Sequence, residues 1–278
     1  EWISKKIAQL QKRMILRKFY RAPFSKIGIR MFHVLIRRKT SDEDPFPYVE
    51  DCPFLYAFRK VIAGDHIALV TMTMPENPES MYYLENGLNL IEKAGFSLET
   101  HRIHSSGGSY CFDYYSPETR QWDIPWELLA IQIQRIQSDG LASSIPKADR
   151  PESRTDFELD ELDLRILDCI TRRISSVSKI RKHLRVGQRR VAEKLRRLKE
   201  EGLVTKVWEV HNIGLSEHAI VYSKDKEVGQ AIAAWALRLP RSIISFSSKE
   251  ELMLLVDLPR GGSFGLASAL ETINNDTT

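Results

Sequence analysis

The sequence has little cysteine, no long apolar run and no secretory signal. Its three cysteines, Cys52, Cys111 and Cys169, are odd in number and far apart among 278 residues. That pattern argues against a disulfide framework and against a cysteine-based zinc site. No apolar stretch approaches the ~18 residues that a membrane span needs. We therefore expect a cytoplasmic protein with no membrane partner, no metal and no cofactor. Because the first residue is Glu1 rather than Met, we also expect a processed chain or a piece of a longer one.

Acidic residues are scarce in two stretches of the chain, although the net charge is only +4. Counts of Lys plus Arg against Asp plus Glu are 12 and 1 for residues 1–39, 9 and 20 for 40–158, 14 and 7 for 159–206, and 6 and 9 for 207–278. Two basic blocks separated by acidic ones indicate a specialised surface for an anionic partner rather than a generally basic protein.

Composition and periodicity predict an α+β chain of several segments. Residues 138–154 are rich in Ser, Pro, Gly and charge, which is typical of a linker. The expected segments are 1–26, a basic wing or connector resembling the end of a first winged helix; 27–136, a ferredoxin-like domain with an appended helix; 137–158, the linker; 159–212, a winged helix-turn-helix; and 213–278, a second ferredoxin-like domain.

Three helices and a strand are predicted in the winged-helix segment. Asp160 is expected to cap the first helix, and Ser176 or Ser178 the second. A tight turn is expected at Val186-Gly187, with glycine supplying the positive φ. The third helix, residues 188–201, has apolar positions at 191, 195 and 198, and residues 203–210 are rich in β-branched residues.

The two flanking segments share an internal repeat. Ile27-Gly-Ile29 resembles Ile213-Gly-Leu215, and each pair is followed by a strand. Residues 67–75 resemble 251–259, where each strand ends at proline and precedes a helix. Residues 2–5 resemble the wing residues 203–206. The order of elements predicts a βαββαβ unit over residues 27–106 and five of its six elements after residue 213. Gly107-Gly108 is expected to be a turn.

The basic block after residue 175 has the chemistry of a DNA-binding surface. Between Ser176 and Lys199 there are ten Lys or Arg and a single acid, Glu193. Helix 188–201 is expected to enter the major groove, where glutamine bonds adenine and arginine bonds guanine. The predicted DNA-binding residues are Lys179, Arg181, Lys182, Arg185, Gln188, Arg189, Arg190, Lys194, Arg197 and Lys206.

The order of these elements resembles the Lrp/AsnC family of feast/famine transcription regulators. Residues 159–167, Leu-Asp-Glu-Leu-Asp-Leu-Arg-Ile-Leu, and residues 191–204, Val-Ala-Glu-Lys-Leu-Arg-Arg-Leu-Lys-Glu-Glu-Gly-Leu-Val, carry the resemblance. It covers residues 159–278, and residues 1–106 resemble only the family's sensor (RAM) domain. The resemblance implies sequence-specific binding of double-stranded DNA, dimerisation through the ferredoxin-like sheets, and an amino-acid effector.

The chain departs from this family at the turn before the third sensor strand. The first copy has Gly64, Asp65 and His66 there, which we take as the candidate effector-binding residues, and the second has Lys249-Glu-Glu-Leu252 without glycine. The two sensor-type units are expected to pair with each other as an intramolecular pseudo-dimer or between chains.

No nucleophile–base constellation and no paired carboxylates at a useful spacing are present, so we expect no enzymatic activity. The alternatives are a pure protein-interaction module and an enzyme of the same fold, such as a sirohaem decarboxylase. The only histidines that such an enzyme could use around a tetrapyrrole are His33, His66, His101 and His104.

Overall fold

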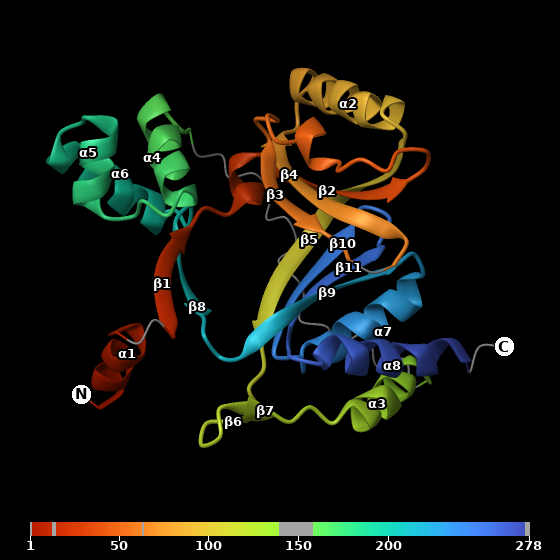
Figure 1. Ribbon diagram of the computed structural model, residues 1–278. Coiled ribbons are helices and arrows are strands. Elements are labelled where there is room, and N and C mark those ends of the chain that lie inside the picture. Colours follow the sequence, from red (N-terminus) through yellow and green to blue (C-terminus); the bar gives the residue numbers. More distant parts are fainter. Residues whose placement is uncertain (1, 13–14, 63, 139–157, 276–278) are drawn as a thin grey trace. The chain divides into compact units, whose positions relative to one another are not determined.

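The computed structural model describes residues 2–12, 15–62, 64–138 and 158–275, which form two compact units (Figure 1). Unit 1 comprises Glu1–Ile27 and Glu152–Ile213, and unit 2 comprises Gly28–Pro151 and Gly214–Thr278. The expected linker lies almost wholly outside the described residues. Both units combine helices with antiparallel strands, which confirms the α+β class.

Unit 1 contains helix α1, a two-stranded ribbon, and three further helices that pack together. Its elements are α1 (Trp2–Lys12), β1 (Leu16–Arg21), a 3₁₀ turn (Phe24–Ile27), α4 (Glu161–Thr171), α5 (Val177–Leu184), α6 (Gln188–Glu200) and β8 (Thr205–Val210). Asp160 caps α4 in a capping box with Asp163, and Ser176 caps α5 through the backbone N–H of Lys179.

The core of unit 1 is built from the apolar faces of its helices. Its fully buried side chains include Ile166 and Ile170 of α4, Ile180 of α5, and Val191 and Leu198 of α6. They recur every three or four residues, so each helix buries one stripe and leaves the opposite face to solvent. The face of α6 that is left exposed is the one rich in Arg and Lys.

The turn between α5 and α6 differs from the prediction. The left-handed residue is Arg185, with φ 56°, and Gly187 has φ −60° and serves as the N-cap of α6. The position that must become left-handed is set by where α5 ends, two residues before the glycine. A non-glycine residue in this conformation costs roughly 1–2 kcal/mol.

The N-terminal segment also differs from the prediction. Residues 2–5 begin helix α1 rather than a wing-like strand, and the strand of this segment is β1. Apolar residues at positions 3, 7 and 10 have helical spacing, which outweighs a four-residue match to the wing. β1 pairs antiparallel with β8, from Leu16 opposite Val210 to Arg21 opposite Thr205.

Unit 2 is built on a seven-stranded antiparallel sheet in the order β3-β4-β2-β5-β10-β11-β9. Its first half contains β2 (Ile29–Arg38), a 3₁₀ turn (Phe46–Tyr48), β3 (Leu55–Lys60), β4 (His66–Pro75), α2 (Pro78–Lys93) and β5 (Phe96–Tyr110). Its remaining elements are β6 (Tyr115–Ser116), β7 (Gln121–Trp122), α3 (Trp126–Ser138), β9 (Leu215–Ser223), α7 (Lys226–Ala236), β10 (Arg241–Ser247), β11 (Leu252–Pro259) and α8 (Gly262–Asn275).

The long strand β5 joins the two halves of this sheet. It pairs with β2 from Phe96 to Ile103 and with β10 from Ile103 to Tyr110. Gly107 and Gly108 therefore lie inside a strand, opposite Ile244 and Ile243, rather than in the expected turn. The edge of β10 supplies backbone partners that the sequence around the glycines does not reveal.

The first half lacks one helix of the expected βαββαβ unit. Only the 3₁₀ turn Phe46–Tyr48 separates β2 from β3. Pro45 and Pro47 flank and enter this turn, and proline lacks the N–H that a continuing helix requires.

Helices cover one face of each half of the sheet, and the uncovered faces meet. Helix α2 covers the first half, and α3, α7 and α8 cover the second (Figure 1). Val34 and Val70 lie in the apolar core of the first half, and Trp235 of α7 is fully buried in the core of the second. On the opposite faces, Leu35 and Leu69 of the first half pack against Met253 of the second. The two ferredoxin-like halves thus pair within one chain.

The contact between α3 and α8 can be tested with two glycines. A Cβ at Gly265 of α8 would lie 2.3–2.5 Å from atoms of the Trp126 ring, whereas a Cβ at Gly87 of α2 meets nothing within 4 Å. Gly265→Ala should lower the free energy of unfolding by about 1–3 kcal/mol through overpacking. Gly87→Ala should raise it by about 0.5–1 kcal/mol because it removes a flexible residue from a helix. Thermal or urea unfolding measures both changes, and equal stability of the two variants would contradict this packing.

Candidate nucleic-acid interface

The N-terminal turn of α6 presents polar and cationic side chains to solvent. Gln188, Arg189 and Arg190 are exposed, and the Arg189 side chain is 93% accessible. Within the described part of the chain, the side chains of Gln188 and Arg190 make no hydrogen bond or ion pair. These two side chains are therefore available to a ligand without the loss of an internal contact.

Two further arginines on α6 are held only by surface ion pairs. Arg189 Nε lies 2.9 Å from Glu193 Oε1, and Arg196 Nη1 lies 3.1 Å from Glu200 Oε1. Exposed pairs one helical turn apart stabilise a helix by about 0.3–0.5 kcal/mol each. A phosphate group can therefore displace either carboxylate at little cost.

Helix α5 and strand β8 add further exposed cations. Lys179, Arg181 and Lys182 on α5 and Arg185 at its C-cap are all exposed, and α5 contains no carboxylate. Lys206 of β8 is also exposed, and its Nζ lies 4.8 Å from the centroid of the Trp208 ring.

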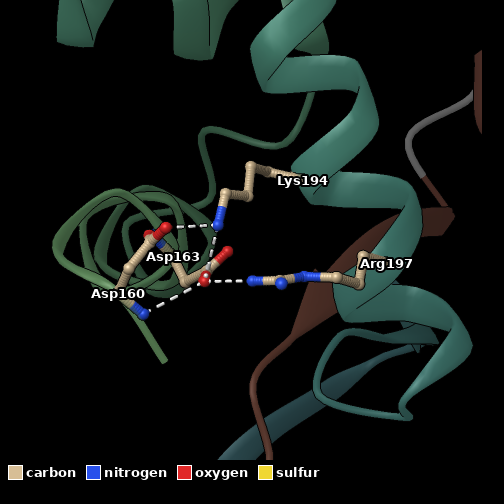
Figure 2. A network of polar contacts seen from close by, with 4 residues as sticks. All are labelled: Asp160, Asp163, Lys194 and Arg197. Carbon is tan, nitrogen blue, oxygen red and sulfur yellow. Dashed lines mark hydrogen bonds and ion pairs between the residues drawn. The ribbon is translucent and has the colours of Figure 1, made fainter. Parts of the chain in front are cut away.

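Lys194 and Arg197, also predicted to bind DNA, form ion pairs with the buried carboxylate of Asp163 (Figure 2). The carboxylate of Asp163 is fully buried and accepts hydrogen bonds from Lys194 Nζ at 3.0 Å and from Arg197 Nη2. Lys194 also binds the carboxylate of Asp160, and only 17% of its side chain is exposed. These two cations therefore hold α6 against the start of α4. The sequence contained a signal for this contact, because Asp160 and Asp163 occupy capping positions directly before a basic helix.

The ion pair between Asp160 and Lys194 shifts the pKa values of both groups in favour of their charged forms. The hydrogen bond from Lys194 lowers the pKa of Asp160 to about 2, and the backbone N–H of Asp163 contributes to the same shift. Burial works against the charge of Lys194, but its bonds to Asp160 and Asp163 outweigh that effect and raise its pKa. The capping box adds a backbone N–H bond from Asp160 to Asp163 Oδ2 at 3.2 Å. A buried charge is tolerated when it is paired and hydrogen-bonded in this way.

Of the predicted effector residues, Gly64 and Asp65 lie in the turn between β3 and β4, and His66 begins β4. Gly64 has φ 101°, Asp65 is exposed, and His66 Nε2 accepts a hydrogen bond from Arg37 Nε at 2.9 Å. Burial, and then the charge of Arg37, lowers the pKa of His66.

Two histidines that the sequence could not place together are neighbours in unit 2. His33 of β2 lies directly opposite His101 of β5, and both side chains are buried. His33 Nδ1 lies 3.0 Å from Thr71 Oγ1, and His101 Nδ1 lies 2.8 Å from Glu251 Oε2. Burial, followed by the charges of Arg59 and His101, lowers the pKa of His33 to about 4, so its ring is neutral at pH 7.

The second ring nitrogens of this pair have no hydrogen bond. The Nε2 atoms of His33 and His101 are buried and have no partner in the described part of the chain. His104, the other histidine of β5, is exposed. No group of three or more His, Cys, Asp or Glu among the described residues has an arrangement that could hold a metal ion. None of the described helices combines the length and the apolarity needed to cross a bilayer.

The Asp163 network yields a stability prediction with a matched control on the same helix. Asp163→Asn removes the charge that pairs with Lys194 and Arg197, and breaking a buried ion pair destabilises proteins by about 3–5 kcal/mol. Because Arg197 is 42% exposed and its charge is screened by solvent, we expect Asp163→Asn to lower the free energy of unfolding by about 2–3 kcal/mol. Asp168→Asn breaks only the exposed pair with Arg172 and should cost less than about 0.5 kcal/mol. Urea unfolding distinguishes the two variants, and similar losses would show that the buried network is not the stronger contact.

Comparison with known proteins finds similarity at the level of the fold. No family model and no curated protein sequence matches the chain. The crystal structure of the siroheme decarboxylase NirDL matches at 15% identity over 98% of this chain and 76% of that chain, with a TM-score of 0.46. Its co-complex with an iron-uroporphyrin III analogue matches at 14% identity over 95% and 74%, also at 0.46. The crystal structure of PH0061 matches at 22% identity over 36% and 70%, with a TM-score of 0.28.

One expectation from the sequence is contradicted by these matches. We expected no enzymatic activity, but the two matches that span almost the whole chain are to an enzyme. A nucleophile–base pair or a pair of carboxylates need not be close together along the chain, because residues far apart in the sequence can meet in the fold.

Proposed function

We propose that unit 1 binds double-stranded DNA by placing α6 in the major groove. The observation that carries this proposal is that α6 has one buried apolar face and one exposed face of polar and cationic side chains. Val191, Leu195 and Leu198 are buried on one face, and Gln188 and Arg190 project from the helix start with no internal partner among the described residues. A helix fits the major groove, and residues near its N-terminus are the ones that reach base edges.

Each exposed side chain has a role that follows from its chemistry. Arg190 can form two hydrogen bonds with guanine, and Gln188 can do so with adenine. Arg189 and the cations of α5 and the wing suit phosphates, which give affinity without sequence preference; these are Lys179, Arg181, Lys182, Arg185 and Lys206. Arg197 is left partly exposed for a phosphate, whereas Lys194 positions α6 from its buried side.

A regulator of the Lrp/AsnC type is the biological role that we propose for this DNA binding. The support is the sequence resemblance of residues 159–278, together with the packed helices α4, α5 and α6 and the β1–β8 ribbon of unit 1 and the paired halves of unit 2. Residues 27–136 and 213–278 would be the two sensor-type segments. An amino-acid effector at Gly64, Asp65 and His66 is not part of the proposal, since nothing beyond the turn itself supports it.

The DNA-binding proposal predicts different effects for the substitution of Arg190 and the substitution of Lys182. Arg190→Ala should relax sequence preference at one base pair by about 1–3 kcal/mol, because a bidentate base contact is lost. Lys182→Ala should weaken binding to all duplexes alike and reduce the slope of log K against log salt by about 0.9, because one phosphate contact is lost. Fluorescence anisotropy with duplexes selected from random DNA measures both effects.

Arg165→Ala is the charge-matched control, because Arg165 is exposed on α4 away from the proposed interface. Arg165→Ala should change neither the sequence preference nor the slope of log K against log salt. Binding that does not vary between low and moderate salt would contradict the proposed function as a whole.

A second candidate function, enzymatic or ligand-binding, is favoured by the histidine pair of unit 2. His33 and His101 are adjacent, buried, and each has a ring nitrogen without a partner in the described part of the chain. A Glu251 carboxylate orients the His101 ring through Nδ1, which is the arrangement by which proteins direct the other nitrogen to a ligand or a proton. Both rings are closed to solvent, so a ligand would have to part the packed sheet faces.

An iron-uroporphyrin III analogue is a suitable probe for this second candidate. If the pair binds a tetrapyrrole, titration should shift the absorption band of the analogue. The double variant His33→Ala/His101→Ala should abolish the shift, and His104→Ala, the exposed histidine of the same strand, should retain it. An unchanged spectrum with the wild-type protein would rule out tetrapyrrole binding at this pair.

A further inference from the structure

The ribbon of β1 and β8 has two faces of different chemistry. Side chains alternate along each strand, so the register of the pair assigns every residue to a face. One face, here called ribbon face A, carries Leu16, Lys18, Tyr20, Lys206, Trp208 and Val210. The other, ribbon face B, carries Arg17, Phe19, Arg21, Thr205, Val207 and Glu209. Face A therefore has lysines and no acid, whereas face B carries an acid that pairs with Arg173 at 3.1 Å.

The lysines of face A stand over aromatic rings. Lys18 Nζ lies 5.8 Å from the centroid of Tyr20, and Lys206 Nζ lies 4.8 Å from that of Trp208. Lys199 of α6 lies over the same Tyr20 ring at 4.3 Å. A cation–π contact at an exposed site stabilises the position of an ammonium group by about 0.5–1 kcal/mol. It does not neutralise the positive charge, as a carboxylate would. Three positive charges are thus gathered over two rings.

This patch is continuous with the proposed DNA-binding helix. Lys199 belongs to the last turn of α6, and Tyr20 packs against the core of unit 1. The ribbon therefore contacts the C-terminal end of α6 through Lys199 and Tyr20. An anion that follows α6 beyond its end meets Lys18 and Lys206 next.

A short sequence match, at an offset different from that of the repeat beginning at Ile27 and Ile213, relates the two lysines of face A to each other. Apolar positions 3, 7 and 10 of α1 match 191, 195 and 198 of α6, and at the same offset Lys18 and Tyr20 match Lys206 and Trp208. That offset also matches Phe19 to Val207, which are direct partners across the ribbon. The ribbon therefore has an approximate two-fold axis through this pair, with the two lysines on either side of it.

We propose that ribbon face A is a second phosphate-binding surface for the same duplex, an inference that rests on the proposed function of unit 1. Its charge is complementary to phosphate, and it continues the surface of α6. A two-fold axis also relates the two antiparallel strands of a DNA duplex. Lys18 and Lys206 are diagonal neighbours with ~7–8 Å between them at the backbone. Each lysine then reaches a phosphate of a different DNA strand.

A pair of charge-matched double variants tests this surface. Lys18→Ala/Lys206→Ala removes two charges from face A, and Arg17→Ala/Arg21→Ala removes two exposed charges from the same two-stranded ribbon on face B. The face A variant should lose about 10-fold or more in affinity at ~0.1 M salt, and its salt slope should fall by about 1.8, the value for two phosphate contacts. The face B variant should stay within about two-fold of the wild type. Anisotropy titrations over a salt series measure both quantities, and circular dichroism confirms that each variant is folded.

The fluorescence of Trp208 gives an independent readout. Duplex DNA bound at face A should quench part of the tryptophan emission, and Trp208→Phe should remove that part. Equal loss of affinity from the two faces would show that only net charge matters and would overturn the proposal. A face A variant that binds like the wild type, while Arg190→Ala does not, would overturn this inference and the phosphate contact assigned to Lys206, and would leave the major-groove role of α6 standing. Absence of any salt-dependent duplex binding by the wild-type protein would overturn both.

Discussion

The buried carboxylate of Asp163 is the contact on which the geometry of unit 1 depends. It lies at the start of α4, caps that helix together with Asp160, and binds Lys194 and Arg197 of α6. An isolated buried carboxylate would be very costly, so the two cations must stay in place for the helices to pack. The hydrophobic core brings α4 and α6 together, and the ionic network fixes the relative translation and rotation of the two helices. The direction in which Gln188 and Arg190 project follows from that setting.

Unit 2 depends on a different constraint, the sharing of strand β5. One half of β5 completes the first four strands of the sheet, and the other half covers the edge of β10. This arrangement leaves the uncovered faces of the two halves to pack on each other around Leu35, Leu69 and Met253. It also buries His33 and His101 side by side. A polar pair at such a position is retained only when hydrogen bonds compensate part of its desolvation, as Thr71 and Glu251 do here.

Much of unit 1 could be predicted because its signals are local. The caps Asp160 and Ser176, the apolar stripe of α6 and the exposed cations of α5 each depend on residues within a few positions of one another. The errors in this unit occurred where two local signals competed. The left-handed position fell on Arg185 rather than on Gly187, and residues 2–5 joined a helix because the longer pattern prevailed.

The sequence by itself determined the α+β class, the helices of the winged-helix segment and the concentration of positive charge on α5 and α6, because periodicity, capping and charge are read along the chain. Only the tertiary structure decided which cations remain available. It placed Lys194 against Asp163, paired β1 with β8, extended β5 through Gly107 and Gly108, and set His33 opposite His101. Each of these contacts joins residues more than thirty positions apart. Long-range pairing depends on which edges and faces remain open once the local elements have formed, and no local pattern records that.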